Sequence, residues 1–236
     1  MPIYTTAQGI KELLEASNIQ GVSGNITINL NNISVIIRQK DIIGNALQEW
    51  LGSFLDSQDI YYRAARGQTF PDLYLSDADN EALCEVKTFF NSASPAFDIA
   101  NFLGYINSVR EKPYRLDSDY LVMSYDNDDD GQIKIMNIWC KKVWEITGPA
   151  REYPLNCQRK NGQIVNIRPV RWMSNRPNVI QPFNTREEFL IALYKTYKEH
   201  TNQVRVARAW LDEVIEGYAR CSGNDMTATI VPYLTR

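Results

Sequence analysis

Apolar residues recur with helical spacing near the start of the chain. Between residues 41 and 56 they fall at i, i+4, i+7, i+8 and i+11, which predicts an amphipathic helix. A short helix is also predicted for residues 7–16. Between the two helices, strand-like stretches at 25–30 and 33–38 flank Asn31–Asn32, a pattern typical of a β-hairpin. The apolar residues that define the longer helix are Ile43, Leu47, Trp50, Leu51 and Phe54.

The next part of the chain is rich in short strand signals. A helix follows them, predicted from Pro95, with Ser94 as its N-cap, to Val109. The apolar run at 120–125 then predicts one more strand. The order over residues 41–125 is therefore helix, three strands, helix, strand, which indicates a mixed α/β sheet with helices on its faces. The three strand-like runs are residues 60–64, 72–75 and 82–90.

The residues after 125 are predicted to be additions to this core. No internal repeat or low-complexity tract is present, so we expect residues 1–236 to form a single domain. An N-terminal helix and hairpin (1–40) precede the core (41–125), and the additions follow it (126–236). In chain order the additions are a strand at 133–139, a short helix at 141–146, a hairpin around Asn161–Gly162, a helix from a capping box of Thr185 and Glu188 to His200, and a helix at 204–218.

Composition narrows the class of protein. Of the 236 residues, 44% are hydrophobic and 22% are charged, and the net charge is -3, as in many globular proteins. The chain has no run of about 18 apolar residues, and its start lacks the basic and apolar regions of a signal peptide. Its 4 cysteines lie far apart and it has 1 histidine, which disfavours a zinc site and favours a reducing cytoplasm. We therefore expect a cytoplasmic protein without a membrane partner.

Three residues of the predicted strands carry candidate chemistry. Glu85 and Lys87 lie two apart in one strand, so their side chains share a face, and Asp72 begins the strand before. If the strands pair, the two carboxylates repel each other unless a divalent cation bridges them, and hard oxygen ligands suit Mg2+. The lysine adds a positive charge where a water molecule loses its proton. The alternative is a surface aspartate beside an ordinary cross-strand Glu and Lys pair.

This motif and its element order resemble those of PD-(D/E)xK nucleases, and more narrowly of type II restriction endonucleases. The resemblance implies an α/β (α+β) fold with a restriction-endonuclease-like mixed β-sheet core (αβββαβ) flanked by helices, and a C-terminal hairpin and helical additions. It implies Asp72 and Glu85 as Mg2+ ligands and Lys87 as the catalytic lysine. The family often adds a glutamate from the helix before the strands, and Glu49 is the residue offered here. A solvated surface glutamate is the alternative for Glu49, because it lies roughly 160° from the apolar stripe of its helix.

Charge is distributed unevenly along the chain. Residues 1–150 carry 12 basic and 20 acidic side chains, whereas residues 151–210 carry 11 and 4. Within the basic part, residues 151–176 mix Arg and Lys with Asn and Gln, which are the side chains that read guanine and adenine in the major groove. The alternatives are a phosphate clamp or a solvated hairpin for these residues, and helix capping for the short polar residues after the third strand. The candidate DNA contacts are Asn91, Ser92 and Ser94 after that strand, and Arg159, Lys160, Arg168, Arg171 and Arg176 in the basic segment.

The resemblance implies a Mg2+-dependent deoxyribonuclease that hydrolyses phosphodiester bonds at a short palindromic double-stranded DNA site. Because a two-fold symmetric site calls for a two-fold symmetric reader, a homodimer is expected. A cognate DNA methyltransferase would protect the DNA of the prokaryotic host. Segments at 137–139 and 166–169 are similar to enzymes of the NgoBV/NlaIV type, which cut GGNNCC. Two alternatives remain open, namely a structure-specific repair nuclease or junction resolvase with the same core, and a non-catalytic DNA-binding module.

Overall fold

The computed structural model describes residues 2–65, 67, 69–92 and 94–234. The chain divides into two compact units. Unit 1 comprises residues 1–95 and 119–141, and unit 2 comprises residues 96–118 and 142–236. Among the described residues, no helix is both long and apolar enough to cross a lipid bilayer.

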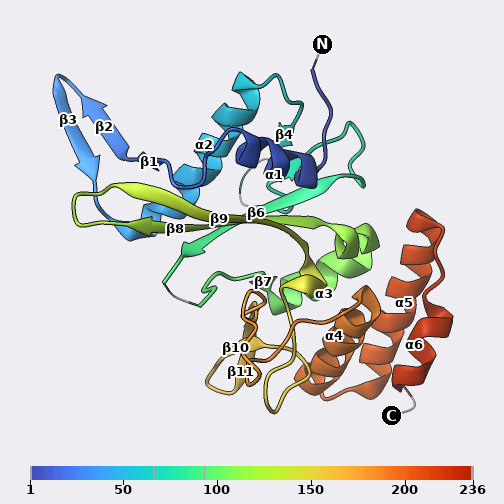
Figure 1. Ribbon diagram of the computed structural model, residues 1–236. Coiled ribbons are helices and arrows are strands. Elements are labelled where there is room, and N and C mark those ends of the chain that lie inside the picture. The colour runs from blue at the N-terminus through green and yellow to red at the C-terminus, as the bar shows by residue number, and fades with distance from the viewer. Residues whose placement is uncertain (1, 66, 68, 93, 235–236) are drawn as a thin grey trace. The chain divides into compact units, whose positions relative to one another are not determined.

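A six-stranded sheet is the centre of unit 1 (Figure 1). Its strand order is β1-β9-β8-β6-β5-β4. β5 and β6 pair in antiparallel fashion, whereas β6 and β8 are parallel neighbours. The mixed sheet expected from the element order is therefore confirmed. The bounds are β1 Ser23–Gly24, β4 Arg63–Ala64, β5 Leu73–Tyr74, β6 Leu83–Phe90, β8 Asp119–Asn127 and β9 Ile133–Lys142.

Two helices of unit 1 share a hydrophobic core with this sheet. α1 spans Ala7–Ala16, as predicted, and Thr6 caps it by accepting a hydrogen bond from the Gly9 N–H. α2 spans Ile43–Ser57, after a 3-10 turn at Lys40–Ile42. The predicted apolar stripe of α2 is the face that enters the core. The helix and sheet residues buried together include Ile10, Leu14, Leu47, Leu51, Leu55, Cys84, Val86, Leu121 and Met123.

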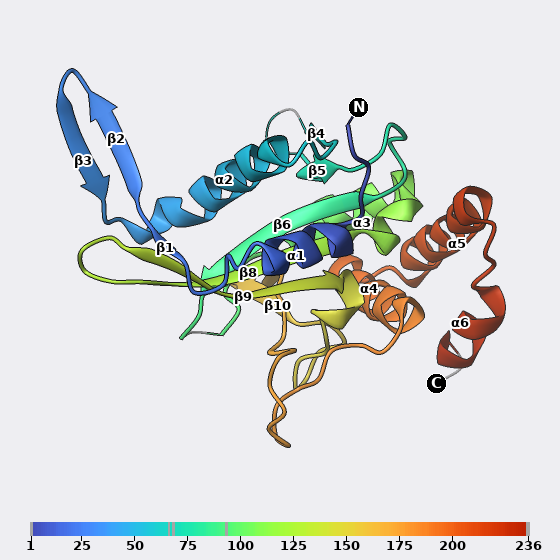
Figure 2. The same cartoon turned by 45° about the horizontal axis from the view of Figure 1, so that its top comes forward.

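A β-hairpin projects from unit 1 in both ribbon views (Figures 1 and 2). It consists of β2 (Ile26–Leu30) and β3 (Ile33–Ile37), which pair in antiparallel fashion. The connecting Asn31 and Asn32 have φ values of 44° and 68°. Asparagine tolerates this left-handed region better than most residues, so the turn is encoded locally and the predicted hairpin is confirmed.

Unit 2 combines a small sheet with helices. Its three-stranded sheet has the order β10-β11-β7, and the predicted Asn161–Gly162 turn joins β10 to β11. Thr185 caps α4 by accepting from the Glu188 N–H, whereas the Glu188 carboxylate accepts from the Asn184 N–H. The bounds are β7 Ala100–Asn101, α3 Phe102–Glu111, a 3-10 helix Pro113–Asp117, a second 3-10 helix Val143–Glu145, β10 Cys157–Lys160, β11 Gln163–Ile167, α4 Arg186–Thr201, α5 Val204–Ser222 and α6 Thr227–Leu234.

The predicted helix start at Pro95 is wrong. The helix begins at Phe102, and Asn101 is its N-cap, because the Asn101 Oδ1 atom accepts a hydrogen bond from the Gly104 N–H at 3.0 Å. Residues 100–101 form the strand β7 instead and pair with β11, and the Ile99 N–H donates to the Ile167 carbonyl. Pairing with a strand more than 60 residues away therefore overrides the local cap signal at Ser94. The short helix predicted at 141–146 is likewise only a 3-10 turn.

Candidate active site

The pairing of β5 with β6 places Asp72 beside the central strand. Leu73 lies opposite Cys84 and Tyr74 opposite Leu83, so the same register sets Asp72 across from Glu85. The Asp72 Oδ2 atom accepts a hydrogen bond from the Val86 N–H at 2.8 Å. This bond fixes the aspartate against the strand that carries the other two candidate residues.

Glu85 and Lys87 form a close ion pair on one face of β6. Lys87 Nζ donates to Glu85 Oε1 at 2.7 Å, and Glu85 is only 7% exposed. The alternate residues Cys84 and Val86 belong to the core shared with α1 and α2. Because side chains alternate along a strand, Glu85 and Lys87 point to the opposite face of the sheet. The structure thus brings Asp72, Glu85 and Lys87 together, as their spacing predicted.

The donor set at this point suits a hard divalent cation. Asp72 and Glu85 supply carboxylate oxygens from two adjacent strands, and a bound cation would relieve the repulsion between them. Mg2+ is typically held by one or two carboxylates, with water and substrate phosphate completing its coordination. Within the described ranges, no group of three or more His, Cys, Asp or Glu residues is arranged to hold a metal ion. Asp72 and Glu85 would therefore be able to hold a Mg2+ ion, with water and phosphate oxygens as its remaining ligands.

Glu49 lies elsewhere in unit 1. It is exposed on α2, the helix that packs against the Cys84 and Val86 face of the sheet. Its charge acts on Tyr62, whose pKa is raised mainly by burial and further by the carboxylates of Asp56 and Glu49. The structure therefore does not bring Glu49 together with Glu85 and Lys87, and its catalytic role stays a prediction.

Asn91 ties the end of the catalytic strand to its neighbours. Its backbone N–H donates to the Tyr125 carbonyl at 2.8 Å. Its side-chain Oδ1 accepts from Ser124 Oγ and from Asn137 Nδ2, both at 3.0 Å. This polar cluster was not predicted, because its members lie 33 and 46 residues from Asn91 along the chain. Ser92 is exposed.

The chain as a whole is similar to known proteins. A family profile described as NgoBV restriction endonuclease matches residues 4–231. The chain belongs to the NgoBV restriction endonuclease family.

Individual relatives support the same family. The type II restriction enzyme NlaIV of Neisseria lactamica is 37% identical over 221 residues, which cover 92% of this chain and 91% of that protein. The type II restriction enzyme NgoBV of Neisseria gonorrhoeae is 36% identical over 166 residues, or 69% of this chain and 94% of that protein. A solved structure of an NlaIV restriction endonuclease aligns with a TM-score of 0.89 at 36% identity, covering 96% of this chain and 94% of the other.

Membership of the NgoBV family makes this chain a site-specific deoxyribonuclease that acts on double-stranded DNA. The family favours this activity over a repair nuclease, a junction resolvase or a non-catalytic binding module. The restriction-endonuclease-like fold expected from the sequence is confirmed by the structural match.

The predicted DNA-contacting cations of unit 2 fall into two groups. Arg159 makes two hydrogen bonds to the Glu199 carboxylate, at 2.9 and 3.2 Å, and stacks on the Tyr153 ring. Arg168 pairs with Asp98 at 2.7 Å and donates to the Ala96 carbonyl. These two arginines bind other parts of unit 2. The remaining three, Lys160, Arg171 and Arg176, are exposed.

Proposed function

We propose that this NgoBV-family enzyme is Mg2+-dependent and hydrolyses one phosphodiester bond in each strand of a palindromic site. The observation that carries the proposal is the convergence of Asp72, Glu85 and Lys87 on adjacent strands. Two acidic side chains and a lysine in this arrangement supply both a metal site and a positive charge beside it.

Each side chain has a distinct part in the proposed reaction. Asp72 and Glu85 hold the metal, and their position on paired strands fixes its location. A bound Mg2+ ion lowers the pKa of water and stabilises charge on phosphate oxygens. As an ammonium group, Lys87 Nζ holds the attacking water and offsets the negative charge that develops on the phosphate, whereas only its neutral amine form would take the proton of that water. The ion pair with Glu85 keeps this ammonium group oriented toward the site.

We assign the proposed DNA contacts first to those lysine and arginine side chains of unit 2 that are exposed. The side chains of Lys160, Arg171 and Arg176 are exposed and therefore accessible to a polyanion. Arg159 and Arg168 would have to exchange Glu199 and Asp98 for DNA, so direct contacts by these two remain predictions. Among the residues after β6, Ser92 and Ser94 remain proposed contacts, and Asn91 can offer DNA only its Nδ2 donor while its Oδ1 stays bonded.

The proposed site also has consequences for the number of copies that bind it and for the host DNA. A palindromic site is read most simply by two copies of one chain related by a two-fold axis, so we propose a homodimer. The resemblance to NgoBV/NlaIV-type enzymes makes GGNNCC the first site to test. A DNA methyltransferase of the same specificity would protect the host DNA.

The assignment of Lys87 can be tested directly. We expect Lys87→Ala to lower Mg2+-dependent cleavage by at least about 100-fold, because an oriented charge at the reacting centre is lost. Binding to specific DNA in Ca2+ should persist and would show that the variant is folded. The variables to measure are the single-turnover cleavage rate and the DNA affinity.

A second lysine of the same sheet provides the control. Lys134 is exposed on β9, and Lys134→Ala should cleave at the wild-type rate. Full activity of Lys87→Ala, or cleavage by the wild type in excess chelator, would overturn the proposed roles.

A further inference from the structure

The projecting β2–β3 hairpin has one continuous apolar face. Cross-strand partners are Ile26 with Ile37, Ile28 with Val35, and Leu30 with Ile33. Alternation along each strand places all six side chains on the same face of the ribbon. Thr27, Asn29 and Ser34 lie on the other face, together with Ile36.

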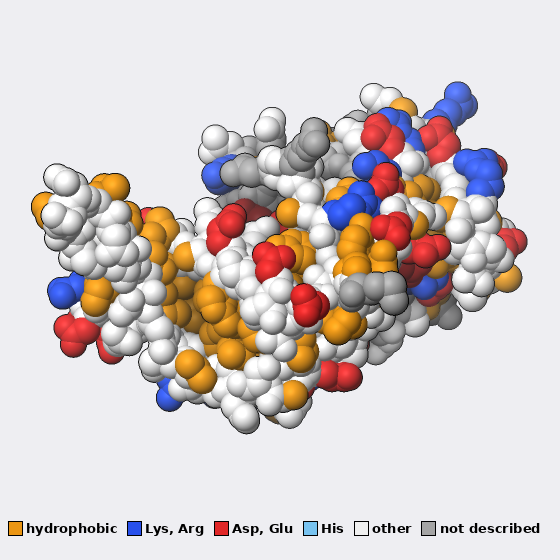
Figure 3. Space-filling view, turned by 90° about the horizontal axis from the view of Figure 1, so that it is seen from above, with side chains coloured by type: hydrophobic (Ala, Val, Ile, Leu, Met, Phe, Trp, Pro, Cys, Tyr) orange, Lys and Arg blue, Asp and Glu red, His pale blue; other side chains and the backbone are white. Residues whose placement is uncertain are grey.

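The outer part of this apolar face is open to solvent. Ile28 and Val35 are 46% and 49% exposed, and Leu30 and Ile33 near the turn are 70% and 67% exposed. Figure 3 shows hydrophobic side chains on this arm at the left of the molecule. Together the four residues present roughly 400 Å² of apolar surface, which is the size of patches that mark interaction sites on soluble proteins.

The base of the hairpin is held against the rest of unit 1, so the arm has a defined root. Ile36 lies against Gly131 in the turn between β8 and β9, where a Cβ atom would come within 2.9 Å of the Ile36 side chain. Gly131 also has a φ of +80°, which favours glycine. The arm therefore leaves unit 1 from a fixed contact.

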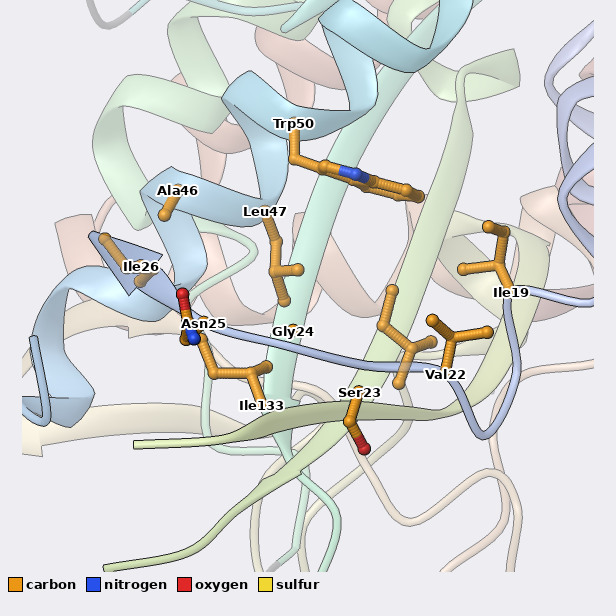
Figure 4. Close-up of a pocket in the computed structure, with 11 residues that line it drawn as sticks. Ile19, Val22, Ser23, Gly24, Asn25, Ile26, Ala46, Leu47, Trp50 and Ile133 are labelled. Carbon is orange, nitrogen blue, oxygen red and sulfur yellow. The ribbon is translucent and has the colours of Figure 1, made fainter. Parts of the chain in front are cut away.

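The apolar face continues into a cavity at the root of the arm. Ile26 belongs to the hairpin face and also lines this cavity of about 290 Å³ (Figure 4). Leu47 and Trp50 of α2 and Ile133 of β9 form other parts of its wall. Arm and cavity together form one apolar surface, which we call the arm surface.

The chemistry of the arm indicates a protein partner. Residues 25–37 contain no charged side chain, whereas DNA binding draws on lysine and arginine to neutralise phosphates. In the described part of the chain, β2 and β3 pair only with each other, so each has an unpaired edge. Two-stranded ribbons are marginally stable alone, and neither strand carries the charge or proline that usually protects an edge.

We propose that the arm surface is the interface with a second copy of this chain. The choice of a second copy rests on the homodimer in the proposed function. A two-fold axis beside the arm would pair two identical apolar ribbons, each covering the exposed face of the other. A standard interface buries about 800 Å² on each partner. The four outer side chains supply about half of that area.

The test compares two double variants on opposite faces of the arm. Leu30→Lys with Ile33→Lys places charge on the apolar face, and Asn29→Lys with Ser34→Lys places the same charge on the polar face. Sedimentation equilibrium of the full chain should give twice 27.1 kDa for the wild type and the polar-face variant. The apolar-face variant should sediment at 27.1 kDa, with its dimer dissociation constant raised at least about 100-fold.

A third double variant, which adds no charge, controls for misfolding. Leu30→Thr with Ile33→Thr keeps strand-forming residues, and it should weaken the dimer in the same direction with an unchanged circular dichroism spectrum. A dimeric apolar-face variant, or a wild type that is monomeric throughout the concentration range, would overturn the proposal. If the wild type is monomeric and the apolar-face variant binds duplex DNA more tightly than the polar-face variant does, the arm contacts DNA and the proposal is likewise overturned.

The outcome is separable from that of the proposed function. Lys87→Ala should remain a dimer, because Lys87 lies outside the arm surface. The apolar-face variant should still nick supercoiled DNA with Mg2+, while its rate of double-strand cleavage falls. A failed metal or Lys87 test leaves the mass measurements valid, and a failed mass measurement leaves the roles of Asp72, Glu85 and Lys87 untouched.

Discussion

Asp72 has two tasks that a single side chain can combine. One of its oxygens, Oδ2, accepts the Val86 N–H and so joins β5 to β6 beyond the last ladder residue. The carboxylate charge is proposed to bind metal beside Glu85. Structure and chemistry at this residue can be separated, since an amide oxygen also accepts a hydrogen bond but carries no charge.

We therefore expect different effects from two substitutions of Asp72. Asp72→Asn keeps an acceptor for Val86 and removes one of two neighbouring negative charges, so the metal-free unfolding free energy should equal or exceed that of the wild type. Asp72→Ala leaves the Val86 N–H without this acceptor and should lower that free energy by about 1–3 kcal/mol. Both should lose Mg2+-dependent cleavage. Urea unfolding and cleavage assays test this, and equal stability of the two variants would contradict it.

Three elements of unit 2 are joined at one partly buried polar cluster. Asp117 ends the 3-10 helix, and it accepts from Tyr218 of α5 at 2.6 Å and from Arg186 of α4 at 2.8 Å. The Arg186 guanidinium also lies over the Tyr218 ring. Burial, and then the hydrogen bond to Asp117, raises the pKa of Tyr218 to about 12. The cluster therefore stabilises the fold with Tyr218 in its neutral form.

This raised pKa predicts a pH dependence of stability. The pKa of Tyr218 is higher in the folded than in the unfolded protein, so the neutral side chain stabilises the folded state. This contribution is fully present below the unfolded value of 10.0 and is lost as the pH rises toward about 12. Tyr218→Phe should lower the unfolding free energy by about 1 kcal/mol near neutral pH. The difference from the wild type should shrink above pH 10.0. Urea unfolding across this range measures it, and a difference that grows with pH would contradict the assignment.

At the scale of the whole molecule, charge and chemistry lie in different units. The net charge is -3, yet unit 2 carries the basic segment at 151–176 and unit 1 carries Asp72, Glu85 and Lys87. A chain with this net charge is not attracted to DNA as a whole, so binding has to come from local groups. The proposed DNA contacts and the proposed catalytic residues therefore lie in different units.

Digestion of a long natural DNA of known sequence tests the proposed site. We expect discrete fragments in Mg2+, because a type II enzyme cuts at defined sequences, and sequencing of their ends should return one two-fold symmetric site. GGNNCC is the first sequence to compare with the mapped ends. A site without two-fold symmetry would contradict the palindromic reading and remove the argument for a homodimer.

The sequence by itself determined the features whose signals are local. The bounds of α1, the hairpin turn at Asn31–Asn32 and the turn at Asn161–Gly162 follow from residues only a few positions apart. The same holds for the shared face of Glu85 and Lys87, since strand geometry alone sets it. The partnership with Asp72 was predictable because β5 and β6 are adjacent in the chain.

Only the tertiary structure decided what depends on distant partners. Pairing with β11 made residues 100–101 a strand and moved the start of α3 to Phe102, with Asn101 as its N-cap. The packing of α2 on the Cys84 and Val86 face placed Glu49 away from Glu85 and Lys87. Glu199 and Asp98 engaged two of the arginines expected at DNA. In each case the deciding free energy is a contact made across tens of residues, which local sequence patterns do not encode.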